Sequence, residues 1–179
     1  MGLAFQASED ESLVVKNKAS AKRDQLMSLL LVQSCSNSKV EAPGRHPALE
    51  LYSGYFYKII KKSIREDEWR SDMELRILSA EHGLLQPDDQ ISYYDRRMDT
   101  KRAEELRPKV VAELRRLITD EEYDRIIVNM GREYRAAIEG FDRGLDVTTE
   151  FIKGDGIGYK GQVLKRVIRG DDTALKVSA

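Results

Sequence analysis

The sequence predicts an α/β protein, a three-layer sandwich with a mostly parallel central sheet of about four strands and helices on both faces. Short apolar runs alternate along the chain with segments whose apolar residues recur at helical spacing. The apolar runs are continuous, which is typical of strands that are buried on both sides. The length of 179 residues corresponds to one domain.

Each predicted strand is short and bounded by polar or turn-forming residues. The strands are expected at residues 27–34, 75–80, 125–130 and, more weakly, 145–149. In such sheets, ligands bind just beyond the carboxyl ends of the strands. Polar clusters follow the first three strands at residues 34–39, 81–83 and 129–134. We therefore expect the functional site at that edge of the sheet.

Four helices are expected between and after these strands. The first is amphipathic and places Leu51, Tyr55, Ile59, Ile60 and Ile64 inward. The second is capped by Asp99 or Thr100, and Pro108 is expected to kink or restart it. The third follows Gly131. The last follows the glycine-rich loop 154–158 and places Tyr159, Val163, Leu164 and Val167 inward.

The domain is expected to span residues 27–170. Residues 1–26 mix polar and charged residues and predict a poorly ordered or loosely docked extension, and residues 171–179 predict a flexible tail.

Composition excludes several classes of protein. Apolar residues make up 41% and charged residues 34%, which excludes a fully disordered chain. The single cysteine, Cys35, excludes an internal disulfide, and no cluster has metal-ligand spacing, so neither a metal nor a cofactor is expected. Without an apolar run of membrane-spanning length or a signal-peptide pattern, the chain is expected to be cytoplasmic.

The loop after the first strand offers hydroxyl, amide and ammonium groups in Ser36, Asn37 and Lys39. These groups suit the recognition of a polar ligand or a phosphate. A Ser/Asn turn that satisfies only backbone groups is an equally good interpretation. Cys35 is interpreted as a buried thiol rather than a nucleophile.

A second concentration of functional residue types lies between residues 79 and 95. Asp95 is a candidate to activate water or to stabilise a positive sugar centre, and His82 is a candidate for proton transfer. For His82, an ordinary loop or helix-end position is the favoured interpretation. Tyr94 either packs in the core or stacks on a base.

Charge is uneven, although the net charge is only -1. Residues 96–116 contain eight Lys/Arg against four Asp/Glu, and residues 153–169 contain five against one. These segments form either solvated helix faces or a basic rim that holds phosphates.

The order of several short motifs resembles a family of small α/β domains, DUF6884. The motifs are Cys35-Ser36-x-x-Lys39, Ser79-Ala80-x-x-Gly83-Leu84-Leu85-x-Pro87, Tyr94-Asp95, and an apolar strand followed by Gly131 and Tyr134. Such domains look related to the uracil-DNA glycosylase superfamily and to domains of archaeosine and deazaguanine modification enzymes. Asn37-Ser38 and His82 depart from the pattern expected of such relatives.

The resemblance implies a DNA glycosylase-like enzyme that flips a modified nucleobase out of DNA and hydrolyses its N-glycosidic bond, in defence against phage DNA. It implies a catalytic Asp95 with His82, base contacts from Ser36, Asn37, Tyr55 and Tyr94, and phosphate contacts from Lys39, Arg132 and Lys160. Two alternatives remain: a non-catalytic nucleic-acid or modified-nucleotide binding module, and an enzyme that acts on free nucleosides.

Overall fold

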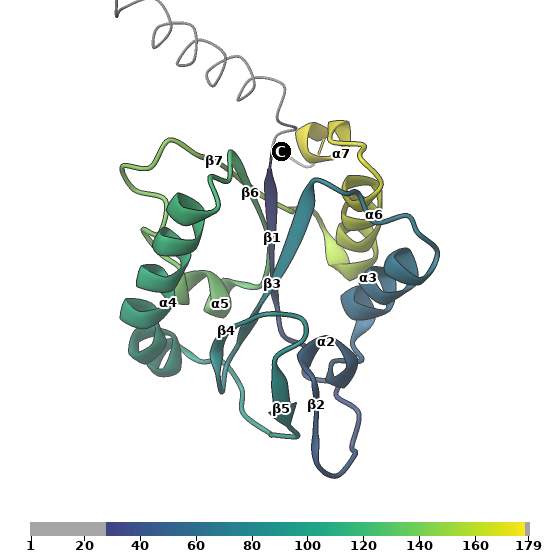
Figure 1. Cartoon of the computed structure of the whole chain (residues 1–179), viewed down its shortest axis with the longest axis vertical. Helices are drawn as coiled ribbons and strands as arrows, with labels where there is room; N and C mark the ends of the chain where they lie inside the picture. The colour runs from purple at the N-terminus through teal and green to yellow at the C-terminus, as the bar shows by residue number, and fades with distance from the viewer. Residues whose placement is uncertain (1–27, 178–179) are drawn as a thin grey trace, which may run out of the picture.

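A five-stranded sheet forms the centre of the protein, as the computed structural model shows for residues 28–177 (Figure 1). Its strands are β1 (Leu29–Ser34), β3 (Met73–Ser79), β4 (Gly83–Leu85), β6 (Arg125–Asn129) and β7 (Thr148–Phe151). Their order is β4-β3-β1-β6-β7, and only the β3–β4 pair is antiparallel. The predicted α/β class with a mostly parallel sheet is confirmed, with five strands in place of about four.

Helices cover both faces of this sheet. They are α2 (Ala48–Leu51), α3 (Tyr55–Arg65), α4 (Thr100–Asp120), α5 (Arg132–Ala137), α6 (Gly156–Ile168) and α7 (Thr173–Val177). In Figure 1 the sheet is seen edge-on, with α4 and α5 on one side and α3, α6 and α7 on the other. The three layers follow from the buried strands, because each face of the sheet must be shielded from water.

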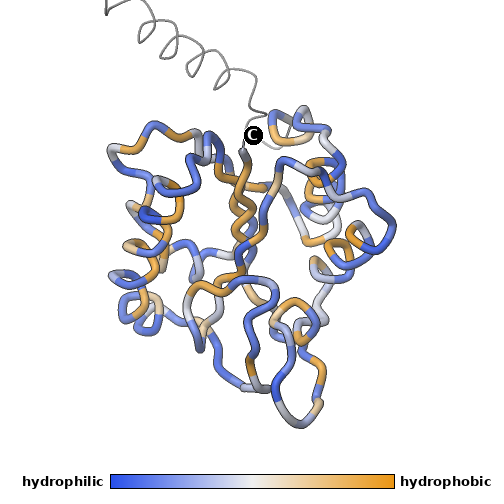
Figure 2. The backbone as a smooth tube through the Cα atoms, viewed as in Figure 1, coloured by the Kyte–Doolittle hydropathy of each residue, from blue (hydrophilic) through white to orange (hydrophobic). Residues whose placement is uncertain are grey.

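Strand β1 lies at the centre of both cores. Leu29 and Leu31 pack on the α3–α6 side, whereas Leu30 and Val32 pack on the α4–α5 side. All four side chains are at most 1% exposed. Figure 2 shows the same arrangement, with hydrophobic colour along the central strands and hydrophilic colour on the outer surfaces of the helices.

Three short strands, β2 (Arg45–Pro47), β4 and β5 (Gln90–Ser92), are not predicted from the sequence. Gly83, with φ of 78°, lets the chain turn back so that β4 pairs with β3. A separate two-stranded sheet joins β2 to β5. Strands of three residues carry too little periodicity to be recognised in a sequence.

The first predicted helix is divided into two helices, because α2 ends at Leu51 and α3 begins at Tyr55, after its N-cap Gly54. The face of α3 that packs on the core carries Tyr57 and Ile60, which are buried, whereas Tyr55 and Ile64 are 42% and 45% exposed. Tyr159 of α6 is also exposed, contrary to the expected inward position, while Val163 and Leu164 are buried as expected.

Helix α4 has the expected cap, because the Asp99 carboxylate accepts a hydrogen bond from the Arg102 N–H at 2.7 Å. The helix continues from Thr100 to Asp120 with Pro108 inside it, so Pro108 does not restart it. Proline removes a single backbone donor, and the buried stripe of residues on both sides of it holds the helix against the sheet.

The carboxyl-terminal segment forms α7 where the sequence predicts a flexible tail. Ala174 and Leu175 are buried in the core on the α3–α6 side. Asp172 accepts hydrogen bonds at 2.7 Å from both Arg70 and Arg125.

The expected extension at residues 1–26 lies outside the described residues. Within residues 28–177, no helix combines the length and the apolar character needed to cross a membrane.

Candidate functional site

The carboxyl ends of β1, β3 and β6 lie together at one edge of the sheet, as the sequence predicts. Gln33 of β1 is paired in register with Asn129 of β6, and Ser34 with Leu78 of β3. The buried Asn129 amide donates to the Gln33 side-chain oxygen at 2.7 Å. This bond satisfies two polar groups that would otherwise be costly to bury.

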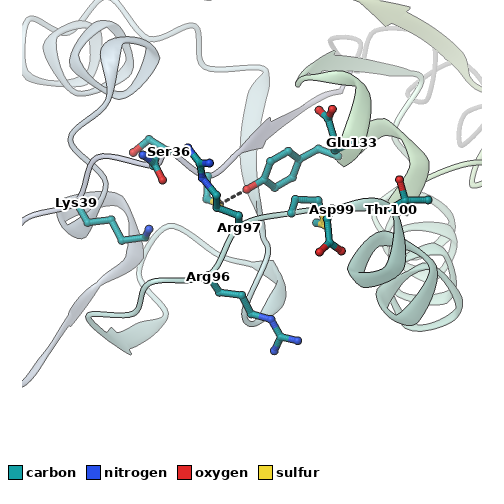
Figure 3. Close-up of a pocket in the computed structure, with 11 residues that line it drawn as sticks. Ser36, Lys39, Arg96, Arg97, Asp99, Thr100 and Glu133 are labelled. Carbon is teal, nitrogen blue, oxygen red and sulfur yellow. Dashed lines mark hydrogen bonds between the residues drawn. The ribbon is translucent and has the colours of Figure 1, made fainter.

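A cavity of about 480 Å³ opens at this edge (Figure 3). It is lined by Cys35, Ser36, Asn37, Lys39, Arg96, Arg97, Met98, Asp99, Thr100, Glu133 and Tyr134. Figure 3 shows Ser36 and Lys39 on one side, Asp99, Thr100 and Glu133 on the other, and Arg97 between them. The volume lies within the range that accommodates a small organic ligand.

Close backbone contacts position the loop that follows β1. The Cys35 N–H extends the β1–β3 ladder by donating to the Leu78 carbonyl at 2.9 Å. The Gly54 N–H donates to the Ser36 hydroxyl at 3.2 Å. A Cβ atom on Gly54 would lie only 2.5 Å from the Ser36 Cβ. The start of α3 therefore requires glycine in order to hold Ser36 at the cavity.

Tyr94 lies at the centre of a hydroxyl network beside the cavity. Ser79 Oγ accepts from the Glu81 and His82 N–H groups, at 3.1 Å each, and lies 2.8 Å from the Tyr94 hydroxyl. Because both lone pairs of Ser79 are used, its proton points to Tyr94. The Tyr94 hydroxyl also shares a hydrogen bond with the Tyr52 hydroxyl, at 2.7 Å.

Burial keeps these phenols neutral. It raises the pKa of Tyr52 to about 12 and the pKa of Tyr94 well above its usual range. The Lys39 ammonium lies 4.3 Å from the centroid of the Tyr94 ring, and His82 contacts that ring edge-on. Tyr94 thus supports the cavity from behind and is not one of the residues that line it.

His82 is partly buried and lies against the edge of the Tyr94 ring. Burial lowers the pKa of His82, which favours the neutral imidazole. Its Nε2 atom has no hydrogen-bond partner among residues 28–177.

Cys35 and Tyr134 form a second polar contact at the cavity wall. The Cys35 sulfur lies 3.0 Å from the Tyr134 hydroxyl. Burial raises the pKa of Tyr134, with the neighbouring thiol adding to that shift. The pair joins the β1 loop to α5, so the two sides of the cavity are held together by this contact.

Three cations and two carboxylates line the cavity. Arg96 is partly neutralised by Glu81 at 3.3 Å. The side chains of Arg97 and Glu133 have no ion-pair or hydrogen-bond partner among residues 28–177, although the backbone of Glu133 is part of α5. Asp99 is occupied in part by capping α4. Because the Lys39 ammonium lies over the Tyr94 ring, Arg97 is the cation most available to an anionic ligand, and Glu133 is the more available of the two carboxylates.

The described residues contain no group of three or more His, Cys, Asp or Glu side chains that could hold a metal ion.

The predicted site residues are only partly brought together. Ser36, Asn37 and Lys39 line the cavity, and His82 and Tyr94 lie behind it.

The other four predicted site residues do not line this cavity. Asp95 is exposed on the adjoining loop. Tyr55 and Lys160 lie on α3 and α6, and Arg132 lines a different cavity beside α5.

Arg97 and Glu133 were not among the residues singled out for the site from the sequence. Arg97 lies two residues after Asp95, and Glu133 lies between Arg132 and Tyr134. Their position next to predicted site residues was the available signal. It was weak, because charged residues are frequent throughout the chain.

This α/β domain with a polar cavity at the carboxyl edge of its sheet matches a known family over residues 29–166: "Family of unknown function (DUF6884)". The match covers most of the chain, and the chain belongs to this family. No curated protein and no solved structure matches it.

Proposed function

We propose that the protein binds a nucleotide of DNA in the cavity at the end of β1 and hydrolyses its N-glycosidic bond. The observation that carries the proposal is the placement of the unpaired Arg97 guanidinium between a hydroxyl–amide wall and a carboxylate wall. A cation suits a phosphate, and hydroxyl and amide groups suit a base edge. The volume of about 480 Å³ is sufficient for one extruded nucleotide.

Asn37 is the proposed base-reading residue, and Ser36 lies next to it in the loop after β1. The Asn37 side chain is exposed and offers both a donor and an acceptor, as the Watson–Crick edge of a base requires. The Ser36 hydroxyl already accepts from Gly54, so it contributes mainly by fixing the loop. Lys39 and Arg97 are the proposed phosphate-binding residues of the cavity.

A carboxylate can promote the cleavage of an N-glycosidic bond by activating water or by stabilising the oxocarbenium-like centre. We propose Glu133 for this role, because it lines the cavity and has no partner among residues 28–177. Asp95 is the alternative; it would need the loop at residues 93–99 to move toward the cavity. The relationship to the uracil-DNA glycosylase superfamily and a role against modified phage DNA belong to this same proposal.

A non-catalytic nucleotide-binding module is the second candidate. The exposure of Asp99 and Glu133, the two carboxylates that line the cavity, favours it. An exposed carboxylate lacks the desolvation that tunes many catalytic acids and bases.

The test is base release from DNA. The protein and its Glu133→Gln and Asp95→Asn variants are incubated with DNAs of differing base modification, and released bases are measured by mass spectrometry. The proposal predicts release by wild type, a loss of at least about 100-fold in Glu133→Gln, and little change in Asp95→Asn.

The Glu139→Gln variant is a matched control, because Glu139 is exposed and lines the other cavity beside α5. Intact DNA in every reaction, together with salt-sensitive binding, would support the binding module and exclude hydrolysis. Release from free nucleosides but not from DNA would support the nucleoside enzyme.

A further inference from the structure

The amino-terminal ends of α3 and α6 present aromatic, apolar and lysine side chains next to the cavity. We call the following residues the α3–α6 surface: Tyr55, Lys58, Ile157, Tyr159 and Lys160. Tyr55, Ile157 and Tyr159 are 42%, 58% and 38% exposed. They are three of the six large hydrophobic side chains that are exposed among the described residues. In Figure 1, α3 and α6 lie side by side on one face of the sheet.

Two glycines hold the tyrosine rings of this surface. A Cβ atom on Gly161 would lie 2.4 Å from a ring carbon of Tyr55, and one on Gly154 would lie 2.1 Å from a ring carbon of Tyr159. Each ring is therefore packed against backbone while part of it remains in solvent. Ile157 precedes Gly161 by one helical turn, which places it on the face of α6 that Tyr55 contacts.

The α3–α6 surface is joined directly to the cavity. Ser36 lines the cavity and accepts a hydrogen bond from Gly54, the residue immediately before Tyr55. A DNA strand with one nucleotide in the cavity would therefore pass Tyr55 on its way out of the cavity.

Lysines border the aromatic residues. Lys58 lies one turn after Tyr55 on α3, and Lys160 precedes Gly161 on α6. Neither lysine has an ion-pair partner among residues 28–177. Unpaired ammonium groups beside exposed aromatic rings are the combination that binds single-stranded nucleic acid, through phosphate contacts and base stacking.

We propose that the α3–α6 surface binds the single-stranded DNA that flanks the nucleotide held in the cavity. This inference rests on the proposed function. Tyr55 stacks on a flanking base, while Lys58 and Lys160 neutralise the adjoining phosphates. The surface would increase affinity for a strand over a single nucleotide without determining the sequence, because every base has a stacking face.

The chain provides a matched pair of glycine variants for the test. Gly161→Ala forces the Tyr55 ring to move, whereas Gly158→Ala in the same helix places its Cβ in open space. Both substitutions introduce the same methyl group into α6. Tyr55→Ala is the second variant; it removes the ring without creating a clash.

Binding is measured by fluorescence anisotropy with labelled single-stranded DNA of about 12 nucleotides. Tyr55→Ala and Gly161→Ala are expected to raise the Kd about tenfold, and Gly158→Ala to leave it unchanged. Lys160→Gln is expected to reduce the slope of log affinity against log salt by about 0.7, whereas Lys165→Gln on the same helix leaves the slope unchanged. Thermal unfolding of each variant verifies that the fold is kept.

Wild-type affinity in both Tyr55→Ala and Gly161→Ala would overturn the inference. A change in oligomeric state in these variants without a change in DNA affinity would also overturn it, because the surface would then bind another copy of the chain.

The base-release assay separates this inference from the proposed function. Base release by wild type, with affinity for DNA unchanged in the α3–α6 variants, would leave the function standing and exclude the surface. Weaker binding by these variants, with no base release by any protein, would leave the surface standing and exclude hydrolysis.

Discussion

Gly54→Ala should disturb the cavity through one steric contact. Gly54 precedes α3 with φ −67° and ψ 172°, a conformation open to alanine. The added Cβ would nevertheless lie 2.5 Å from the Ser36 Cβ, an atom fixed to the backbone of the β1 loop. The loop must therefore move away from α3, which breaks the hydrogen bond between the Gly54 N–H and the Ser36 hydroxyl.

Gly131→Ala separates this clash from the general effect of alanine before a helix. Gly131 precedes α5 with φ −71° and ψ 173°, and its added Cβ would come no closer than 3.8 Å to the flexible Glu133 side chain. Both variants lose the same preference for glycine over alanine at the helix N-cap. The difference between them therefore reports the contact with Ser36.

Overpacking of this kind costs about 1–3 kcal/mol, so we expect Gly54→Ala to be about 2 kcal/mol less stable than Gly131→Ala. For a protein of this size, that difference lowers Tm by about 4–8 °C, which differential scanning calorimetry resolves. Equal Tm values for the two variants would refute the reasoning, because the loop would then be able to yield without cost.

Three further perturbations test other parts of the structure. Asp172→Asn removes the carboxylate charge that pairs with both Arg70 and Arg125. It should lower the free energy of unfolding, measured by urea titration, by about 1–2 kcal/mol. An unchanged free energy would mean that α7 docks through its apolar residues alone. Tyr94→Phe deletes the hydroxyl that joins two hydrogen bonds and should cost about 1–3 kcal/mol by the same titration, whereas a neutral result would contradict the assigned network. Burial lowers the pKa of His82, so the unfolded chain binds more protons than the folded chain below about pH 6.5. The free energy of unfolding should therefore fall as the pH decreases from about 7 to 5.5, and it should fall less steeply in His82→Gln. Equal slopes in wild type and His82→Gln would contradict this assignment.

The central sheet could be predicted because its strands are nearly continuous apolar runs. Residues Leu29 to Val32 are apolar on both faces, as expected of a parallel strand that is covered on both sides. The cap of α4 could be narrowed to Asp99 or Thr100, because these short polar side chains precede a helical pattern, and the structure shows that Asp99 is the cap. The polar clusters could be predicted to lie at the same edge of the sheet, because parallel strands place their carboxyl ends together.

The helix faces could not be predicted at the same level. The apolar spacing of Tyr55 and Ile64 is helical, but α3 packs on the core through Tyr57 and Ile60 and leaves both of them exposed. Tyr159 likewise fits an inward stripe by spacing and is exposed. Periodicity predicts that a helix forms, whereas packing against the neighbouring elements determines which of its faces is buried.

The cavity walls depend on tertiary contacts that no local pattern encodes. Cys35 meets Tyr134 from a position 99 residues away in the sequence. Arg97 enters the cavity from the loop before α4, beside residues of the β1 loop. Asp95, only two residues earlier, does not line it, which illustrates how a loop separates neighbouring side chains.

The claim that the cavity at the end of β1 binds a nucleotide phosphate is tested most directly by calorimetric titration. Nucleoside monophosphates and the matching nucleosides are titrated into wild type, Arg97→Gln and Arg132→Gln. Arg132 is a matched control because it is an exposed arginine that lines the other cavity. We predict that the nucleoside monophosphates bind and the matching nucleosides do not. Arg97→Gln is expected to weaken this binding about tenfold or more, and Arg132→Gln is expected to leave it unchanged. Equal affinity in wild type and Arg97→Gln, or loss only in Arg132→Gln, would contradict the account.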